Sequence, residues 1–256
     1  MMSKAWSPLH FYRTEGRAPV VLVCEHAAPH MPEDFGDLGL DAKTHMSHAV
    51  WDIGALKMAE AMSQELDAPL VSCGVSRAIY DCNRPFAAPD CIPSKSENIA
   101  FPGNVSLSAS QRDTRRRLIH DLFHEGVAQL IASQSEKLGA AVAVITLHSF
   151  TPVYFGTPRT VEIGFLHHDR PALSEAAFRV EQHRNIYNAA LNEPYAKQDG
   201  VTYSLARHAD AQGLHSTMIE VRNDLIQSDS NAQAMGQHLA ATLKEALARV
   251  TAGRGA

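Results

Sequence analysis

The chain has 256 residues, of which 45% are hydrophobic and 20% are charged. This is ordinary globular usage, so it excludes a disordered chain and predicts a single domain over residues 1–256. The net charge of -5 provides no basic surface of the kind that nucleic acid or an anionic membrane surface requires, and we predict neither partner.

The chain also shows no feature of a secreted or membrane-spanning protein. Its longest apolar runs are too short to cross a bilayer, and the N-terminus has no basic region followed by an apolar run. Cys24, Cys73, Cys82 and Cys91 form neither a CxxC pair nor a zinc-ribbon spacing, so we expect reduced thiols. These features predict a cytoplasmic protein and leave its oligomeric state open.

Short apolar or β-branched runs and longer periodic stretches alternate along the chain. In chain order, buried strands are predicted at residues 19–24, 69–75, 141–147, 161–166 and 216–221. Helical periodicity of apolar residues is found at residues 49–66, 110–137, 174–191 and 231–250. This alternation predicts a three-layer α/β sandwich around a mostly parallel sheet.

Two long segments, residues 27–46 and 85–107, show neither pattern. Loops of this length without secondary structure are uncommon in compact domains, and they usually form binding surfaces or lids. We therefore expect them to shape a binding site.

Polar side chains follow the predicted strands at the edge where open α/β sheets bind ligands. Each could be a capping or ion-pairing group, but two histidines and a carboxylate at one edge suit a catalytic divalent metal, typically zinc. His26 and His148 are the natural pair of ligands. Asp52 or His48, at the start of the next predicted helix, would supply the third ligand.

The same edge carries residues suited to hydrolysis. A metal lowers the pKa of its bound water to about 7, and a base must then take the proton and return it to the departing amine. Glu220, near the end of the last predicted strand, is the best-placed base. Arg84, and after it Arg77, would bind a substrate carboxylate through paired hydrogen bonds.

Several segments carry a more specific pattern. They are Cys24-Glu25-His26-Ala27, Trp51-Asp52-Ile53-Gly54-Ala55, Ser76-Arg77, Asp81-Cys82-Asn83-Arg84-Pro85, Leu147-His148-Ser149-Phe150-Thr151-Pro152, Asn192-Glu193-Pro194-Tyr195 and Ile219-Glu220-Val221-Arg222-Asn223-Asp224-Leu225-Ile226. In these segments the chain resembles the N-formylglutamate amidohydrolase family, over most of its length. That family is similar in fold to zinc carboxypeptidases and aspartoacylases, which implies a mixed sheet flanked by helices and one catalytic zinc.

The resemblance also implies roles for individual residues. His26 and His148 match zinc ligands, Glu220 matches the general base, and Asn83 with Arg84 matches the pair that binds the substrate carboxylate. Carboxypeptidases place a glutamate three residues after the first histidine, where this chain has Pro29. Many members of the family carry an aspartate at the corresponding helix start, so the resemblance implies Asp52 as the third ligand, with His48 and Glu25 as alternatives.

Four further residues are candidates for contacts with the substrate. His124 follows Phe123 where the family often has a Tyr-His pair, although a histidine on a helix surface would look the same. His208 precedes the last predicted strand and could reach the leaving group or the oxyanion. Arg77 or Arg222 would bind a second carboxylate or the developing oxyanion.

These features predict a zinc-dependent amidohydrolase that cleaves a small N-acyl amino acid. The resemblance makes N-formyl-L-glutamate, from histidine breakdown, the leading substrate, although the segments look more like family members with no settled substrate. One alternative is a carboxypeptidase-like or aminoacylase-like hydrolase of a larger N-acyl or peptide substrate. Another is a metal-binding or ligand-binding protein that retains the fold without catalysis.

Overall fold

A seven-stranded sheet runs through the molecule in the order β1-β3-β2-β6-β11-β9-β10. The computed structural model describes residues 6–252, so residues 1–5 and 253–256 of the predicted domain lie outside the described part. The strands are β1 (Leu9–Tyr12), β2 (Val20–Cys24), β3 (Leu70–Cys73), β6 (Ala143–Phe150), β9 (Ile163–Leu166), β10 (Ala189–Leu191) and β11 (Ser216–Arg222). Strands β3, β2, β6 and β11 are parallel, whereas β1 and β9 run antiparallel to their neighbours β3 and β11.

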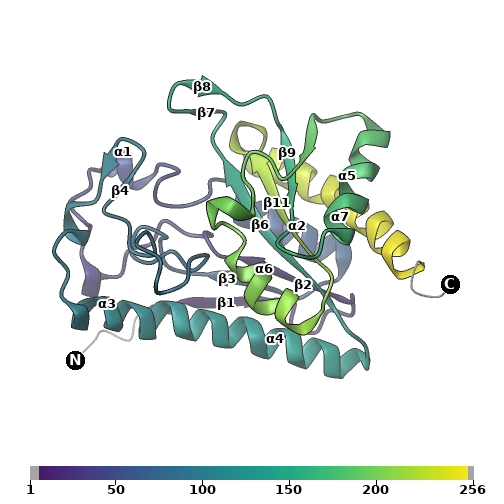
Figure 1. The fold of residues 1–256 in the computed structure, drawn as a ribbon, viewed down its shortest axis with the longest axis horizontal. Coiled ribbons are helices and arrows are strands. Elements are labelled where there is room, and N and C mark those ends of the chain that lie inside the picture. The colour runs from purple at the N-terminus through teal and green to yellow at the C-terminus, as the bar shows by residue number, and fades with distance from the viewer. Residues whose placement is uncertain (1–5, 253–256) are drawn as a thin grey trace.

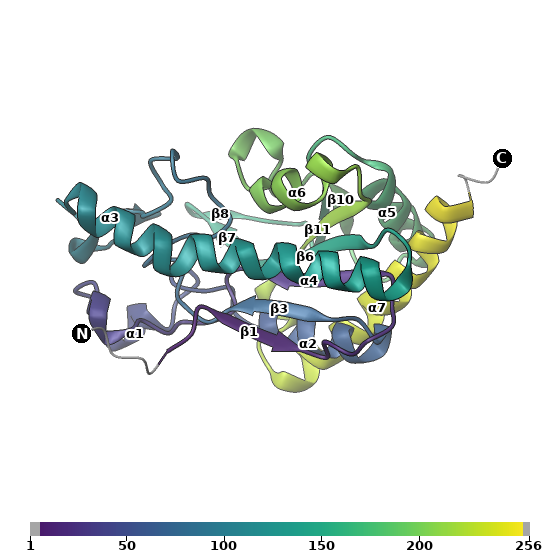
Figure 2. The same cartoon turned by 90° about the horizontal axis from the view of Figure 1, so that it is seen from below.

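Helices cover both faces of this sheet. One face packs against α2 (Ala55–Leu66), α5 (Ala172–Arg184) and α7 (Asp229–Ala252). The other packs against a long helix that runs the length of the molecule, made of α3 (Ala109–Arg115), a π-helical segment (Arg116–Asp121) and α4 (Leu122–Leu138) (Figures 1 and 2). The predicted three-layer sandwich around a mixed, mostly parallel sheet is therefore confirmed.

Strand β2 shows how the sequence builds the two cores. Its side chains alternate between the faces of the sheet, as the period of two in a strand requires. Val20 and Leu22 belong to the core formed with α2 and α7, whereas Val21 and Val23 belong to the core that contains Phe123 of α4. All five residues of β2 are buried, because both faces are covered.

Glycine allows α2 and α7 to approach closely. A Cβ atom on Gly236 would lie 2.6 Å from the Cβ of Ala61 and 2.6 Å from the carbonyl oxygen of Met58. Both are shorter than van der Waals contact, so a side chain at residue 236 would push the two helices apart. The packing of α7 against α2 holds α2 in place, and α2 begins just after Asp52.

Two predicted helices had wrong boundaries, each for a backbone reason. The helix predicted from residue 49 begins at Ala55, because Gly54 has a φ of 80° and cannot continue a right-handed helix. The helix predicted at residues 174–191 ends at Arg184, because Asn185 adopts a left-handed conformation with a φ of 52°. Strand β10 then follows, and it was not predicted.

Other short elements were also missed. They are β1, α1 (Ala42–His45), β4 (Lys95–Ser96), β5 (Ile99–Ala100), the hairpin β7 (Val153–Tyr154) and β8 (Thr157–Pro158), and α6 (Tyr203–His208). The β7–β8 hairpin projects beyond the sheet at the top of Figure 1. Two of these elements, β4 and β5, lie within the long loop of residues 85–107.

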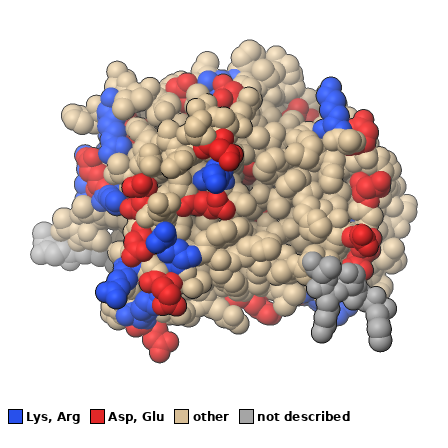
Figure 3. All heavy atoms as spheres, turned by 180° about the vertical axis from the view of Figure 1, so that it is seen from behind, with Lys and Arg blue, Asp and Glu red and all other residues tan. Residues whose placement is uncertain are grey.

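Two further expectations concern nucleic-acid binding and membrane-spanning segments. On the face drawn in Figure 3, most Lys and Arg side chains lie beside Asp or Glu side chains. The prediction that no nucleic acid binds stays a prediction. Within residues 6–252, no helix combines the length and the apolar character needed to cross a membrane.

Candidate metal centre

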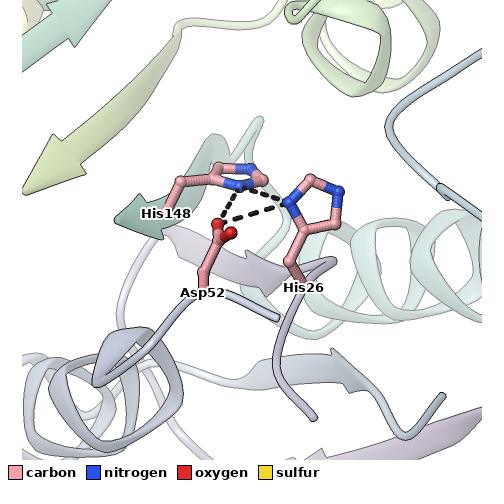
Figure 4. Close-up of side chains that lie close together, drawn as sticks. All are labelled: His26, Asp52 and His148. Carbon is pink, nitrogen blue, oxygen red and sulfur yellow. Dashed lines mark hydrogen bonds and ion pairs between the residues drawn. The ribbon is translucent and has the colours of Figure 1, made fainter. Parts of the chain in front are cut away.

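Two histidines and an aspartate converge at the sheet edge. His148 Nδ1 lies 2.9 Å from Asp52 Oδ2 and 3.2 Å from His26 Nδ1, and His26 Nδ1 lies 3.3 Å from the same oxygen (Figure 4). All three side chains are buried. The structure thus brings together the three residues predicted as metal ligands in a group that could hold a metal ion.

The parallel pairing of β6 with β11 brings together His148 and Glu220, which were expected to lie at neighbouring strand ends. Strand β6 continues past the predicted end at residue 147 to Phe150, so His148 lies within the strand. It is paired in register with Glu220 of the adjacent strand β11. Paired residues on neighbouring strands point to the same face, so both side chains face the site. His26 reaches it from just beyond β2, on the other side of β6.

The segment before α2 holds Asp52 in place. Its backbone N–H donates to the carbonyl oxygen of His26 at 2.9 Å, so the two residues are tied together. Two residues later, a Cβ atom on Gly54 would lie 2.2 Å from the carbonyl oxygen of Ile226. Only glycine allows this close approach, which brings the Asp52 loop against the chain that follows β11.

Two more buried carboxylates face the outer nitrogens of the histidines. His26 Nε2 lies 2.7 Å from Asp81 Oδ1, and His148 Nε2 lies 3.1 Å from Glu25 Oε2. With the protons on Nε2, both Nδ1 lone pairs point at the centre. Carboxylates in this position orient histidine ligands and make them more basic. Glu25 therefore faces the far side of His148 and does not join the group.

The pKa values of the group reflect this concentration of charge. Burial alone would lower the pKa of His148, but Glu25 and Asp52 outweigh burial and raise it well above its usual value. Burial would raise the pKa of Asp52, but the neighbouring His26 and His148 hold it well below its usual range. The group therefore retains the ionised carboxylate that a metal ligand requires.

Arg77 holds two of these carboxylates together. Its Nη1 donates to Asp52 Oδ1 at 3.2 Å, and its Nη2 donates to Asp81 Oδ2 at 2.9 Å. Both terminal nitrogens are thus engaged inside the protein. This geometry favours a role in positioning Asp52 and Asp81 over the predicted role in binding a second substrate carboxylate.

The donor set fits a divalent cation. Two imidazole nitrogens and one carboxylate oxygen are the ligand types of zinc sites, and three protein ligands leave a coordination position open in catalytic sites. Within residues 6–252, one other group of metal-ligand type occurs, formed by His168, Asp169 and Asp210. It is partly exposed, and Asp169 is paired there with Lys197. The group of His26, Asp52 and His148 therefore differs from this second group in being buried and in having carboxylates behind its histidines.

Glu220 lies beside the group without belonging to it. Burial raises the pKa of Glu220 to about 7. Its Oε2 atom is buried and accepts no hydrogen bond from any described residue. An unpaired carboxyl oxygen next to two histidines is the arrangement expected for a group that exchanges protons with a substrate or a water.

A cavity of about 300 Å³ opens onto the group and is lined by His26, Asp52, His148 and Glu220. Arg77, Asn83 and Arg84 also line it, together with His48 and residues of the loop at 85–107, which confirms that this loop shapes the site. His48 Nε2 pairs with Glu97 Oε1 at 2.7 Å and is not part of the metal-ligand group.

The two residues predicted to bind the substrate carboxylate differ in their surroundings. The Asn83 amide oxygen accepts from Ser204 N–H at 3.1 Å, and its amide nitrogen donates to the Val201 carbonyl. Asn83 therefore ties the 201–204 segment to the site. Arg84 donates from Nε to Asp90 Oδ2 at 2.8 Å and lines the cavity.

Three predicted substrate contacts are not brought to this cavity. Arg222 is held by ion pairs with Glu162 and Asp224 at 3.4 and 2.8 Å. His124 and His208 are buried against each other, with 2.7 Å between His124 Nδ1 and His208 Nε2. None of the three is among the described residues that line the cavity.

The buried histidine pair makes the fold sensitive to acid. Burial, together with the charge of Arg207, lowers the pKa of His208 to about 4. In the unfolded chain this side chain takes up a proton near pH 6.5. The unfolded state therefore binds more protons between these values, and stability falls as the pH falls through this window, by about 2 kcal/mol at pH 5.

We expect His208→Gln to weaken this acid sensitivity. Urea unfolding at pH 7.5 and at pH 5 gives the loss of stability for each protein, and the loss should be smaller in the variant by about 2 kcal/mol. The free energy of unfolding of each protein at pH 5 is compared with its own value at pH 7.5, so a general destabilisation by the substitution cancels. An equal loss in both proteins would show that His208 is already protonated in the folded state at pH 5.

Sequence reasoning missed three residues of the site. Asp81 belongs to a segment that carries the family resemblance but was given no role, although a carboxylate near two histidines is the usual outer partner of a ligand. Tyr195 lines the cavity, and burial, followed by the charge of Glu220, raises its pKa to about 12. Arg159 contacts this tyrosine and was not considered, because nothing in its local sequence marks it.

Comparisons with known proteins show the family of this chain. The sequence model of the family FGase, N-formylglutamate amidohydrolase, matches residues 18–227. The crystal structure of gene product Atu2144 from Agrobacterium tumefaciens is 38% identical, with a TM-score of 0.94 over 98% of this chain and 99% of that chain. A search of curated proteins gives no significant match.

A more distant structure shares the fold. N-formylglutamate amidohydrolase from Ralstonia eutropha JMP134 is 16% identical, with a TM-score of 0.59 over 93% of this chain and 99% of that chain.

Proposed function

Because this chain belongs to the N-formylglutamate amidohydrolase family, we propose that it is a zinc-dependent amidohydrolase that cleaves a small N-acyl amino acid. N-formyl-L-glutamate, giving glutamate and formate, is the leading candidate substrate. The observation that carries the proposal is the buried group of His26, Asp52 and His148 with Glu220 beside it.

His26, Asp52 and His148 would hold the zinc ion through Nδ1, Oδ2 and Nδ1. When bound, zinc would act as a Lewis acid on the acyl carbonyl and on a water molecule. Glu220 takes the proton from the attacking water and returns it to the departing amine nitrogen. Attack forms the new carbon–oxygen bond of the carboxylic acid, and the carbon–nitrogen bond of the amide breaks.

Positioning of the substrate falls to the cavity wall. Arg84 binds the α-carboxylate with its terminal nitrogens, while Asp90 holds its Nε. Asn83 supports this contact by fixing the neighbouring 201–204 segment. A cavity of about 300 Å³ is at the lower end of the range for small-molecule sites, which suits a small N-acyl amino acid.

The carboxylates that face the outer nitrogens of the two histidines should strengthen the binding of the metal. Asp81→Asn keeps a hydrogen-bonding group near His26 Nε2 but removes its charge, so we expect zinc to bind about 10- to 100-fold more weakly. Competition with a chromophoric chelator measures the change, and thermal unfolding checks that the fold is intact. Unchanged zinc affinity would mean that His26 does not bind the metal through Nδ1.

An assay across acyl groups tests the proposed function. Purified protein loaded with zinc is incubated with formyl-, acetyl- and longer acyl-amino acids and with short peptides, and the released amine is measured. We expect the highest kcat/KM with formyl or acetyl substrates. Preferential cleavage of peptides would support a carboxypeptidase-like enzyme, and no release from any substrate would support a binding protein.

A further inference from the structure

Arg159, which follows β8 of the hairpin, lies among three aromatic rings. Its guanidinium carbon is 4.4 Å from the ring centre of Tyr154, 4.8 Å from that of Tyr195 and 5.5 Å from that of Phe150. Its Nη1 donates to the hydroxyl oxygen of Tyr195 at 3.0 Å and to the Thr151 carbonyl at 3.5 Å. These contacts fix the plane of the guanidinium and reduce the entropy that a ligand would have to overcome.

This guanidinium retains an open edge. Among residues 6–252, no carboxylate lies within ion-pair distance of Arg159, and no acceptor is bonded to its Nε or Nη2. By contrast, Arg77 is held by two carboxylates, and Arg84 and Arg222 are each held by at least one. The Nε–Nη2 edge of an arginine matches the two oxygens of a carboxylate.

Arg159 faces a second cavity that adjoins the catalytic one. This cavity has a volume of about 730 Å³. It shares four lining residues with the catalytic cavity: Arg84, Tyr154, Tyr195 and Val201. A substrate whose reacting amide lies at the metal group could therefore extend past the two tyrosines to the open edge of Arg159.

We propose that Arg159, with the rings of Tyr154 and Tyr195, forms a subsite for the acidic group at the end of the substrate's side chain. This inference rests on the proposed function and assigns the residue that selects an acidic side chain at this site. Because the two cavities adjoin, we expect acidic side chains longer than that of glutamate to be accepted too. Arg159 thus replaces Arg77 and Arg222 as the residue that binds a second carboxylate.

The test compares a charged substrate with its neutral counterpart of the same shape. For the wild type we expect kcat/KM to be about 10- to 100-fold higher with N-formyl-L-glutamate than with N-formyl-L-glutamine. N-formyl-L-2-aminoadipate should resemble the glutamate substrate. Arg159→Gln should bring the glutamate-to-glutamine ratio close to one through KM, and Arg159→Lys should give an intermediate ratio.

The ratio is insensitive to a general defect in folding, because such a defect lowers both rates alike. The matched control is Arg179→Gln, which removes an exposed arginine paired with Glu175 on α5 and should keep the wild-type ratio. A wild-type ratio in Arg159→Gln overturns the subsite, and so does a wild type that does not prefer the charged substrate.

A binding measurement separates failure of the subsite from failure of the proposed function. If the zinc-loaded protein hydrolyses none of these substrates, calorimetry with glutarate still reports on Arg159. If glutarate binds at least about 10-fold more weakly to Arg159→Gln than to the wild type, the subsite is supported even though the protein is not an amidohydrolase. Equal binding, or no binding to either protein, overturns it.

Discussion

Glu220→Gln is expected to lower kcat by about 10²- to 10⁴-fold while leaving the zinc content unchanged. Glutamine has nearly the shape of glutamate but cannot take a proton from water. Burial raises the pKa of Glu220 to about 7, so the fold already tolerates a neutral group at this place. The loss should therefore appear in turnover, with little change in thermal stability.

Steady-state kinetics with N-formyl-L-glutamate, together with metal analysis of the same preparation, measures the effect. Glu175→Gln, the same substitution on the exposed surface of α5, serves as the control and should retain wild-type turnover. Near-normal activity of Glu220→Gln would show that another group acts as the base.

Asp52→Asn is expected to weaken zinc binding by at least about 100-fold, because loss of a ligand exceeds the effect of losing an outer partner. The substitution removes the only carboxylate oxygen of the proposed ligand set and keeps the volume of the side chain. It also removes a partner of Arg77, so some loss of stability is expected as well. Activity should fall in step with zinc occupancy.

Zinc affinity is measured by chelator competition on protein that thermal unfolding shows to be folded. The control is Asp169→Asn, which alters the second, partly exposed group of metal-ligand type and should not change the affinity of the buried site. Unaltered zinc affinity in Asp52→Asn would leave His26 and His148 without their third ligand and would point to His48 or Glu25.

The sequence contained enough to predict the sheet and the centre of the site. Buried runs of apolar residues identify strands, and His148 and Glu220 lie on two strands whose parallel pairing brings them together. Asp52 lies in a loop, where the spacing of residues in the sequence does not determine which way a side chain points. It was identified from the family resemblance. Its position depends on contacts such as that of Gly54 with Ile226, which are distant in sequence.

Other parts of the site could not be predicted, because they depend on side-chain direction and on short elements. His208 belongs to α6, a helix of six residues that leaves little periodic signal, and it turns toward His124 instead of the cavity. Arg222 is the last residue of β11, and two acidic residues hold its side chain. Arg159 approaches from a hairpin whose two-residue strands resemble any loop in sequence.

Removal and return of the metal tests the proposed chemistry most directly. The protein is stripped with a chelator, and amine release from N-formyl-L-glutamate is followed before and after one equivalent of zinc is added per chain. We predict that activity is lost on stripping and restored by zinc in wild-type protein, but not in Glu220→Gln. Full activity of the metal-free wild type would contradict the proposal that His26, Asp52 and His148 form a catalytic metal site.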